Sequence, residues 1–206
     1  MAPVFPINGL KTPRNTYQEK WEKRYNALSP EAQRQIDAIN QMHWREYQLK
    51  PIKRTKEYPD EGDRFVLNPL ENVYFVGIVI KNRIHSILGE DLLTVFIFRN
   101  VYRSLSEIPP VIQVDKLLIP PAVVGWEYWT RGYFSKIQSE IRRKKPTTYG
   151  FYRIISGKYV NESREQLVRK PKEIGIFGVA TIPGIASEIR KELIMDPTIL
   201  SAESNI

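Results

Sequence analysis

Near the beginning of the chain, large apolar and aromatic residues recur at helical spacing. Tyr17, Trp21, Tyr25 and Leu28 follow one another every three to four positions, and the residues between them are mostly charged or polar. This spacing places the four side chains in one stripe along a helix. The pattern predicts an amphipathic helix over residues 16–28.

A second helix is predicted immediately after the first. Residues 29–31 read Ser-Pro-Glu, which combines a capping hydroxyl, a proline at the first helical position and an acidic side chain near the positive end of the helix dipole. We predict a helix over residues 30–48, docked together with the first helix on the rest of the protein. The face of this helix carries Ala32, Ile36, Ile39, His43 and Tyr47.

From residue 59 onward the pattern changes to that of strands. Segments rich in Val, Ile, Phe and Tyr are separated by short connections, which predicts an antiparallel meander. The three strands are expected over residues 64–69, 73–81 and 92–100, with a loop over 82–91. The second and third contain consecutive apolar residues, which is typical of central strands with both faces buried. A second sheet, a barrel interior or the N-terminal helices could cover the second face.

The second half of the chain predicts shorter elements. Proline pairs at residues 109–110 and 120–121 oppose long regular elements. Residues 126–134 are dense in aromatic side chains and are expected to be extended. Short strands are predicted over residues 111–119, 149–155 and 174–180, and a helix over about 185–195. The Asp-Pro pair that follows is expected to end this helix.

Together these elements predict an α+β protein: an antiparallel, barrel-like sheet with an N-terminal helical pair and a C-terminal helix. The 206 residues, 42% hydrophobic and 11% aromatic, are enough for one domain with a packed core. We expect a flexible arm over residues 1–15, a helical N-terminal extension over 16–58, a mostly β domain over 59–195 and a frayed tail over 196–206.

The composition narrows the possible chemistry. The chain has no cysteine and only two histidines, His43 and His85, which excludes disulfides, thiol catalysis and the usual zinc sites. It also has no phosphate-binding glycine loop, so we predict a protein that is not an enzyme and needs no cofactor or metal. It shows neither a secretory signal nor an apolar run long enough to span a bilayer, so a cytoplasmic protein without membrane contact is expected.

The positive charge of the chain is unevenly distributed. The formal net charge is +8, yet residues 59–140 carry 8 basic and 10 acidic residues, and the basic excess lies in the two flanks. Dense basic patches occur at residues 50–56, 142–145 and 169–172. Such patches are ordinary in solvated loops, but they also bind phosphate. A nucleic-acid-binding accessory module is therefore an alternative function.

Acidic residues gather in two of the predicted loops. The first group is Asp60, Glu61 and Asp63, and the second is Glu90 and Asp91. Such groups can hold a metal or perform acid–base chemistry, although turn formation is the ordinary explanation. Because loops beside a sheet are accessible, these carboxylates are also candidates for contact with a partner. A hydrolase with an unrecognised site is a third alternative.

An aromatic segment provides the remaining candidates. If residues 127–134 are extended, the alternation of a strand places Trp129, Arg131 and Tyr133 on one face, where Arg131 could stack on either ring. Aromatic residues with arginine are typical of interface hot spots. A corner of the core locked by aromatic packing is the ordinary explanation of the same run.

Three short motifs follow one another in a characteristic order. They are residues 61–70 (EGDRFVLNPL) with 74–79 (YFVGIV), residues 118–121 (LIPP) with 129–134 (WTRGYF), and, more weakly, residues 175–180 (GIFGVA). In this order they resemble the immunity protein 26 family of bacterial polymorphic toxin systems. The resemblance covers residues 61–195 and implies a mostly β module that binds and neutralises a cognate toxin. The N-terminal helices and the basic loops fall outside it.

We therefore predict a non-catalytic bacterial immunity protein. It would bind one cognate toxin domain, a nuclease or another toxin that acts in the cytoplasm, and cover its active site. Tight inhibitors of this kind bury roughly 800 Å² per partner around a few aromatic or arginine anchors. The candidate contact residues are Asp60, Glu61, Asp63, Glu90, Asp91, Trp129, Arg131 and Tyr133.

Overall fold

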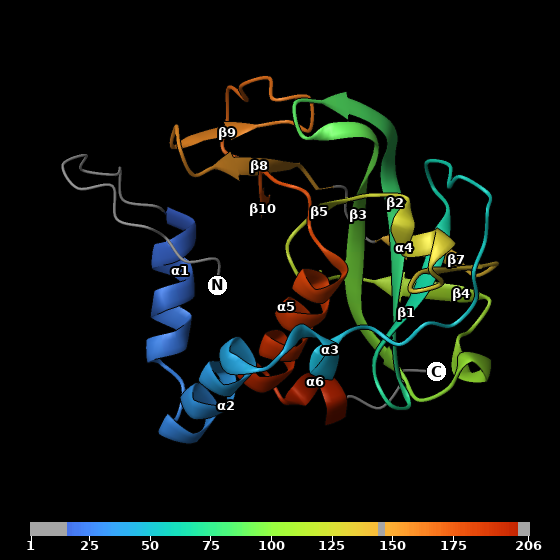
Figure 1. The fold of residues 1–206 in the computed structure, drawn as a ribbon, viewed down its shortest axis with the longest axis horizontal. Helices are drawn as coiled ribbons and strands as arrows, with labels where there is room; N and C mark the ends of the chain where they lie inside the picture. Colours follow the sequence, from blue (N-terminus) through green and yellow to red (C-terminus); the bar gives the residue numbers. More distant parts are fainter. Residues whose placement is uncertain (1–15, 144–146, 202–206) are drawn as a thin grey trace.

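One five-stranded sheet lies at the centre of the protein, and every neighbouring pair of its strands is antiparallel (Figure 1). The structure is a computed structural model that describes residues 16–143 and 147–201. The arm expected over residues 1–15 lies outside the described residues. The strand order is β5-β3-β2-β1-β6, with β1 at Arg64–Leu70, β2 at Val73–Ser86, β3 at Gly89–Tyr102, β5 at Ala122–Val124 and β6 at Ser135–Ile137.

The predicted antiparallel meander is confirmed, but its two long strands extend further than the hydrophobic pattern indicated. β2 and β3 have 14 residues each and meet at Ile87 and Leu88, inside the loop expected over residues 82–91. The ladder shifts register repeatedly here, and Arg83 and Asp91 have positive φ angles of 47° and 53°. Such bulges and polar residues conceal a strand from a period-two pattern, although the backbone pairing continues.

Both faces of the long strands are buried, as their continuous apolar runs predicted. Along β3, Leu93, Val95 and Ile97 enter one hydrophobic core, whereas Phe96 and Phe98 enter another core on the opposite face. This alternation follows from the two-residue period of a strand. The two faces therefore need two separate covers.

A helix provides one cover and a small sheet provides the other. The helix α5, Ile182–Met195, contributes Ile185 to the first core. The second core includes Ile112 from a two-stranded parallel sheet, which consists of β4 at Val111–Val114 and β7 at Glu140–Arg143. Two of the N-terminal helices, α2 at Pro30–Gln41 and α3 at Trp44–Tyr47, contact α5, and Tyr47 also packs against the first core.

The expectation of a barrel-like sheet is not met. Among the described strands, β5 and β6 form the two edges of the sheet and do not pair with each other. Both edge strands have only three residues, and β5 follows the proline pair at residues 120–121, which cannot donate ladder hydrogen bonds. Because α5 and the small sheet already bury both faces, the sheet stays open.

A third sheet stands beside β5. It has the order β10-β8-β9, with β8 at Tyr149–Arg153, β9 at Lys158–Val160 and β10 at Glu173–Ile176. β8 and β9 form a hairpin, whereas β10 runs parallel to β8. Phe151 and Val123 share a small core that joins this sheet to β5.

Three helices precede the sheet, where two were predicted. α1 covers Thr16–Asn26, and α2 covers Pro30–Gln41 with Ser29 as its N-cap. The predicted continuation to residue 48 is wrong, because the chain becomes extended at Met42 and His43.

His43 begins a new short helix instead of continuing α2. Its side chain accepts a hydrogen bond from the backbone of Arg45 at 3.4 Å, and Glu46 completes a capping box for α3, Trp44–Tyr47. Helical spacing predicts that His43 lies on a helix face, whereas its side-chain nitrogen caps α3.

The aromatic segment over residues 126–134 is not extended, contrary to the prediction. It forms the short helix α4, Glu127–Thr130, and then turns sharply at Gly132, whose φ angle is +84°. The backbone amides of Tyr133 and Phe134 both donate to the carbonyl of Tyr128, at 2.8 and 3.0 Å. This turn directs the aromatic side chains inward.

These side chains form an aromatic cluster with the first strand. Phe65 stacks on Phe134 with ring centroids 4.2 Å apart, and Trp129 meets both rings edge-on at 5.5 and 5.1 Å. All three side chains are at most 2% exposed. The cluster joins β1, α4 and the start of β6 in one tightly packed unit.

The basic linker before the sheet is fixed across this unit. The backbone amides of Ile52 and Thr55 donate to the carbonyls of Gly132 and Trp129, at 2.7 and 3.2 Å. A Cβ atom on Gly132 would lie only 3.1 Å from the backbone nitrogen of Arg54. Because glycine has no Cβ atom, Gly132 can adopt the left-handed conformation of the turn and leaves room for the linker to approach closely.

The C-terminal helix α5 is followed by a further short helix. α6 covers Thr198–Ser201, and its residue Ile199 is 3% exposed. The first part of the tail predicted over residues 196–206 thus contains a helical turn. Residues 202–206 lie outside the described residues.

The aromatic cluster predicts a large stability cost for its truncation. Trp129→Ala is expected to lower the free energy of unfolding by about 3–5 kcal/mol, because it leaves a cavity beside the stacked rings of Phe65 and Phe134. The matched control is Trp44→Ala, since Trp44 is 41% exposed and should change stability by roughly 0.5 kcal/mol or less. Urea denaturation followed by circular dichroism measures both. Equal stability of the two variants would contradict the position of Trp129 in the core.

Candidate interaction surfaces

The first acidic group lies in the turn that leads into β1. Asp60 and Glu61 are exposed, and their carboxylates accept hydrogen bonds from the side chain and the backbone of Asn82, at 3.3 and 3.4 Å. Asp63 differs, because the ammonium group of Lys136 lies 3.0 Å from its carboxylate. The turn therefore presents Asp60 and Glu61 outward and uses Asp63 for an internal ion pair.

The second acidic group lies at the start of β3. Glu90 and Asp91 are both exposed. Burial raises the pKa of Tyr58, and the negative charge of Asp91 raises it further. The Tyr58 hydroxyl also accepts a hydrogen bond from the backbone of Arg83 at 3.1 Å. Because Arg83 directly follows Asn82, both acidic groups border the same stretch of β2.

We call Asp60, Glu61, Glu90 and Asp91 the acidic end of the sheet. The structure brings these four candidates near one stretch of backbone, although they come from two separate loops. The guanidinium group of Arg83 lies 6.0 Å from the Tyr58 ring in the same area. The acidic end is thus a mixed surface with an excess of carboxylates.

Trp129, Arg131 and Tyr133 do not share a face, so this part of the prediction is wrong. Trp129 lies in the core, and Tyr133 is half-buried with its hydroxyl hydrogen-bonded to the side chain of Gln48. Arg131 alone of the three is exposed. The helical turn of α4 has replaced the strand alternation that would have aligned them.

The basic patch over residues 142–145 begins at the end of β7, and its two arginines form ion pairs within the protein. Arg142 makes two hydrogen bonds to Glu140, at 2.8 and 2.9 Å. Arg143 is mostly buried and pairs with Glu173 of β10 at 3.2 Å. Residues 144 and 145 lie outside the described residues. The sequence alone gave no sign that Arg143 connects β7 to β10.

The sequence analysis did not identify one buried carboxylate. Glu162 is 4% exposed, and its carboxylate accepts a hydrogen bond from the Tyr149 hydroxyl at 2.8 Å. The ammonium group of Lys81 forms an ion pair with the same carboxylate at 3.3 Å. Burial and this hydrogen bond raise the pKa of Tyr149 well above its ordinary value. These contacts connect β2, β8 and the segment after β9.

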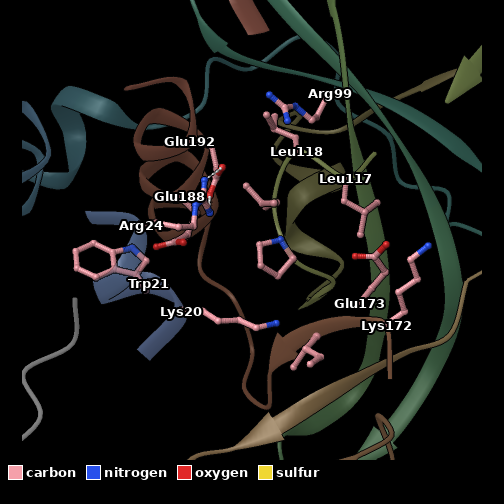
Figure 2. A pocket seen from close by; sticks show the side chains of 13 residues that line it. Lys20, Trp21, Arg24, Arg99, Leu117, Leu118, Lys172, Glu173, Glu188 and Glu192 are labelled. Atoms are coloured by element: carbon pink, nitrogen blue, oxygen red, sulfur yellow. Dashed lines mark hydrogen bonds and ion pairs between the residues drawn. The ribbon is translucent and has the colours of Figure 1, made fainter. Parts of the chain in front are cut away.

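A cleft of about 390 Å³ opens beside α1, α5 and β10 (Figure 2). It lies within the usual size range of ligand pockets, roughly 300–1,000 Å³. Its apolar lining consists of Trp21, residues 117–120 and Ile174. The charged residues that line it are Lys20, Arg24, Arg99, Lys172, Glu173, Glu188 and Glu192.

An ion pair holds α1 against α5 at one side of the cleft. The guanidinium group of Arg24 makes two hydrogen bonds of 2.7 Å to the carboxylate of Glu192. This bidentate geometry is the strongest form of the arginine–carboxylate contact. Sequence reasoning missed the cleft, because its residues come from separate segments that only the tertiary structure brings together.

Residues 16–143 and 147–201 contain neither a group of metal ligands nor a membrane-spanning helix. No three or more His, Asp or Glu side chains in these ranges are grouped so that they could hold a metal ion. None of the helices in them combines the length and the apolar character needed to cross a membrane.

An open sheet with exposed charged loops and a small cleft is an arrangement suited to binding another macromolecule. The model of the family described as Immunity protein 26 matches residues 60–163, about half of the chain. The chain therefore belongs to the immunity protein 26 family, as the order of its motifs predicted. The match spans β1 to β9 and excludes α1, α2, α3 and α5. The chain has no significant match among curated proteins or solved structures.

The buried carboxylate predicts a specific loss of stability. Glu162→Ala is expected to lower the free energy of unfolding by about 1–3 kcal/mol, because the half-buried Tyr149 hydroxyl and Lys81 lose their shared partner. Glu165→Ala removes an exposed acid from the same segment and should cost roughly 0.5 kcal/mol or less. Urea denaturation at neutral pH compares the two variants. A loss no larger for Glu162→Ala than for Glu165→Ala would show that the buried contacts contribute nothing.

Proposed function

We propose that this protein binds one toxin domain stoichiometrically and neutralises it without catalysis, by covering its active site or substrate groove. Membership of the immunity protein 26 family is the observation that carries the proposal. The toxin would act in the cytoplasm, and this protein would meet it there. Binding is assigned to the module over residues 59–195. The helices over 16–58 support it, α2 and α3 through their contacts with α5 and α1 through the ion pair of Arg24 with Glu192.

The acidic end is the surface that we propose for the first encounter with the toxin. Its four carboxylates are exposed, and residues 59–140 have an excess of acidic side chains in a chain that is otherwise basic. A toxin that cleaves nucleic acid needs a basic substrate groove. Carboxylates that oppose such a groove would speed association and imitate the phosphates that the groove binds.

The third sheet favours a second candidate function, that of a nucleic-acid-binding accessory module. Exposed basic residues follow the β8–β9 hairpin, and the ammonium group of Lys170 lies 5.8 Å from the Tyr159 ring. Cationic and aromatic side chains together bind single-stranded nucleic acid. Salt-sensitive binding to generic DNA or RNA would support this function, whereas binding to one toxin domain alone supports immunity.

The proposal predicts protection that is specific and stoichiometric. When the protein is co-expressed with the toxin domain encoded beside its gene, cells should survive, and unrelated toxins should kill them. In an activity assay with purified components, inhibition should be complete near an equimolar ratio. Complete inhibition at strongly sub-stoichiometric amounts of this protein would instead indicate an enzyme.

The acidic end predicts an effect on the rate of association. Glu90→Lys combined with Asp91→Asn should lower the association rate constant about tenfold or more at low salt and weaken its dependence on ionic strength. Asparagine is chosen at position 91 because it tolerates the positive φ angle of this residue. Stopped-flow mixing with a catalytically inactive toxin domain measures the rate.

The control is a pair of substitutions on other elements that changes the net charge by the same amount. Glu71→Lys combined with Glu22→Gln alters two exposed acids outside the acidic end. This variant should associate at nearly the rate of the unaltered protein. Equal slowing by both pairs would mean that overall charge, rather than the acidic end, guides the encounter.

A further inference from the structure

The cleft beside α1 contains two cations that the fold does not use. The ammonium groups of Lys20 and Lys172 make no hydrogen bond or ion pair with any described residue, and both side chains are exposed. In Figure 2, Lys20 reaches from α1 into the open space of the cleft, and Lys172 stands on the side away from α1, beside Glu173.

The other charges of the cleft are compensated within the protein. Arg24 pairs with Glu192, and Arg99 lies 2.5 Å from Asp196. The two remaining acids have partners as well, since Glu173 pairs with Arg143 at 3.2 Å and Glu188 lies 3.7 Å from Lys191. Two uncompensated positive charges are left, so the cleft is complementary to carboxylates.

Apolar surface lies between these two lysines. Residues 117–120 and Ile174 line the cleft, and Trp21 presents its indole ring from α1. A volume of about 390 Å³ is too small for a folded element and has room for a few side chains. An apolar side chain that fills such a pocket is the usual anchor of a protein interface.

We propose that the cleft receives a loop or chain end of the toxin that presents a carboxylate next to a large apolar side chain. The inference rests on the proposed function and deepens it. The apolar side chain occupies the space beside Trp21 and Ile174, and the carboxylate lies between Lys20 and Lys172. The acidic end and the cleft then contact the toxin with opposite charges, which permits a single orientation of the complex.

The experiment reverses the two free charges. Lys20→Glu combined with Lys172→Glu should weaken binding of a catalytically inactive toxin domain at least about tenfold, as like charges face each other in the complex. The matched control, Lys23→Glu combined with Arg169→Glu, makes the same change in net charge on exposed residues of the same two segments outside the cleft. It should retain its affinity. Calorimetric titration measures both, and the thermal melting midpoint of each variant should equal that of the unaltered protein.

A second measurement identifies the occupant. A carbodiimide joins an ammonium group to a carboxylate only when the two are in contact. In the complex of unaltered proteins, mass spectrometry should find Lys20 or Lys172 linked to an Asp, Glu or C-terminal carboxylate of the toxin, and Lys23 unlinked.

The outcomes separate this inference from the proposed function. If the unaltered protein does not bind the toxin domain, the proposed function fails and this inference fails with it. In a second outcome the unaltered protein binds, the Lys20→Glu, Lys172→Glu variant binds equally well, and no cross-link reaches either lysine. The cleft is then not a contact surface, and only this inference is overturned. Equal weakening by the control pair would also overturn it.

Discussion

Burial of both faces of β2 and β3 is the constraint on which the rest of the structure depends. Side chains alternate along these strands, so Leu93, Val95 and Ile97 need one apolar cover and Phe96 and Phe98 need another. α5 provides the first, and the β4–β7 pair provides the second. The loops and helices that connect these covers to the sheet carry the surfaces that we propose for partner binding. The match to the immunity protein 26 family includes the sheet and the small cover but not α5.

The aromatic cluster of Phe65, Trp129 and Phe134 shows how the same residue types can serve packing instead of binding. Aromatic side chains bury a large area and contribute strongly both to cores and to interfaces, so composition alone does not distinguish the two roles. The position of Gly132 decides between them. Its left-handed backbone turns the segment inward and lets the linker before β1 close over it.

Charged side chains in this protein divide into two kinds. Some connect elements that are distant in sequence, such as Glu162 with Lys81, Arg24 with Glu192, and Arg143 with Glu173. Each of these ion pairs has no net charge, so it contributes little to the electrostatic attraction of a partner. Others are exposed, among them the carboxylates of the acidic end and the two free lysines of the cleft, and these two groups have opposite sign. Charge complementarity of this kind contributes to the rate and specificity of association more than to affinity alone.

Local patterns by themselves determined the meander, the burial of both faces of its long strands, the start of α2 at Ser29 and the family. These features depend on residues close together in the chain, where periodicity and capping act directly. The tertiary structure alone decided the parallel pairings of β4 with β7 and β8 with β10, the internal role of Trp129 and the cleft that Lys20 and Lys172 share. Each of these depends on contacts between segments far apart in sequence, and no local period encodes which distant side chain will neutralise a charge or cover an aromatic ring.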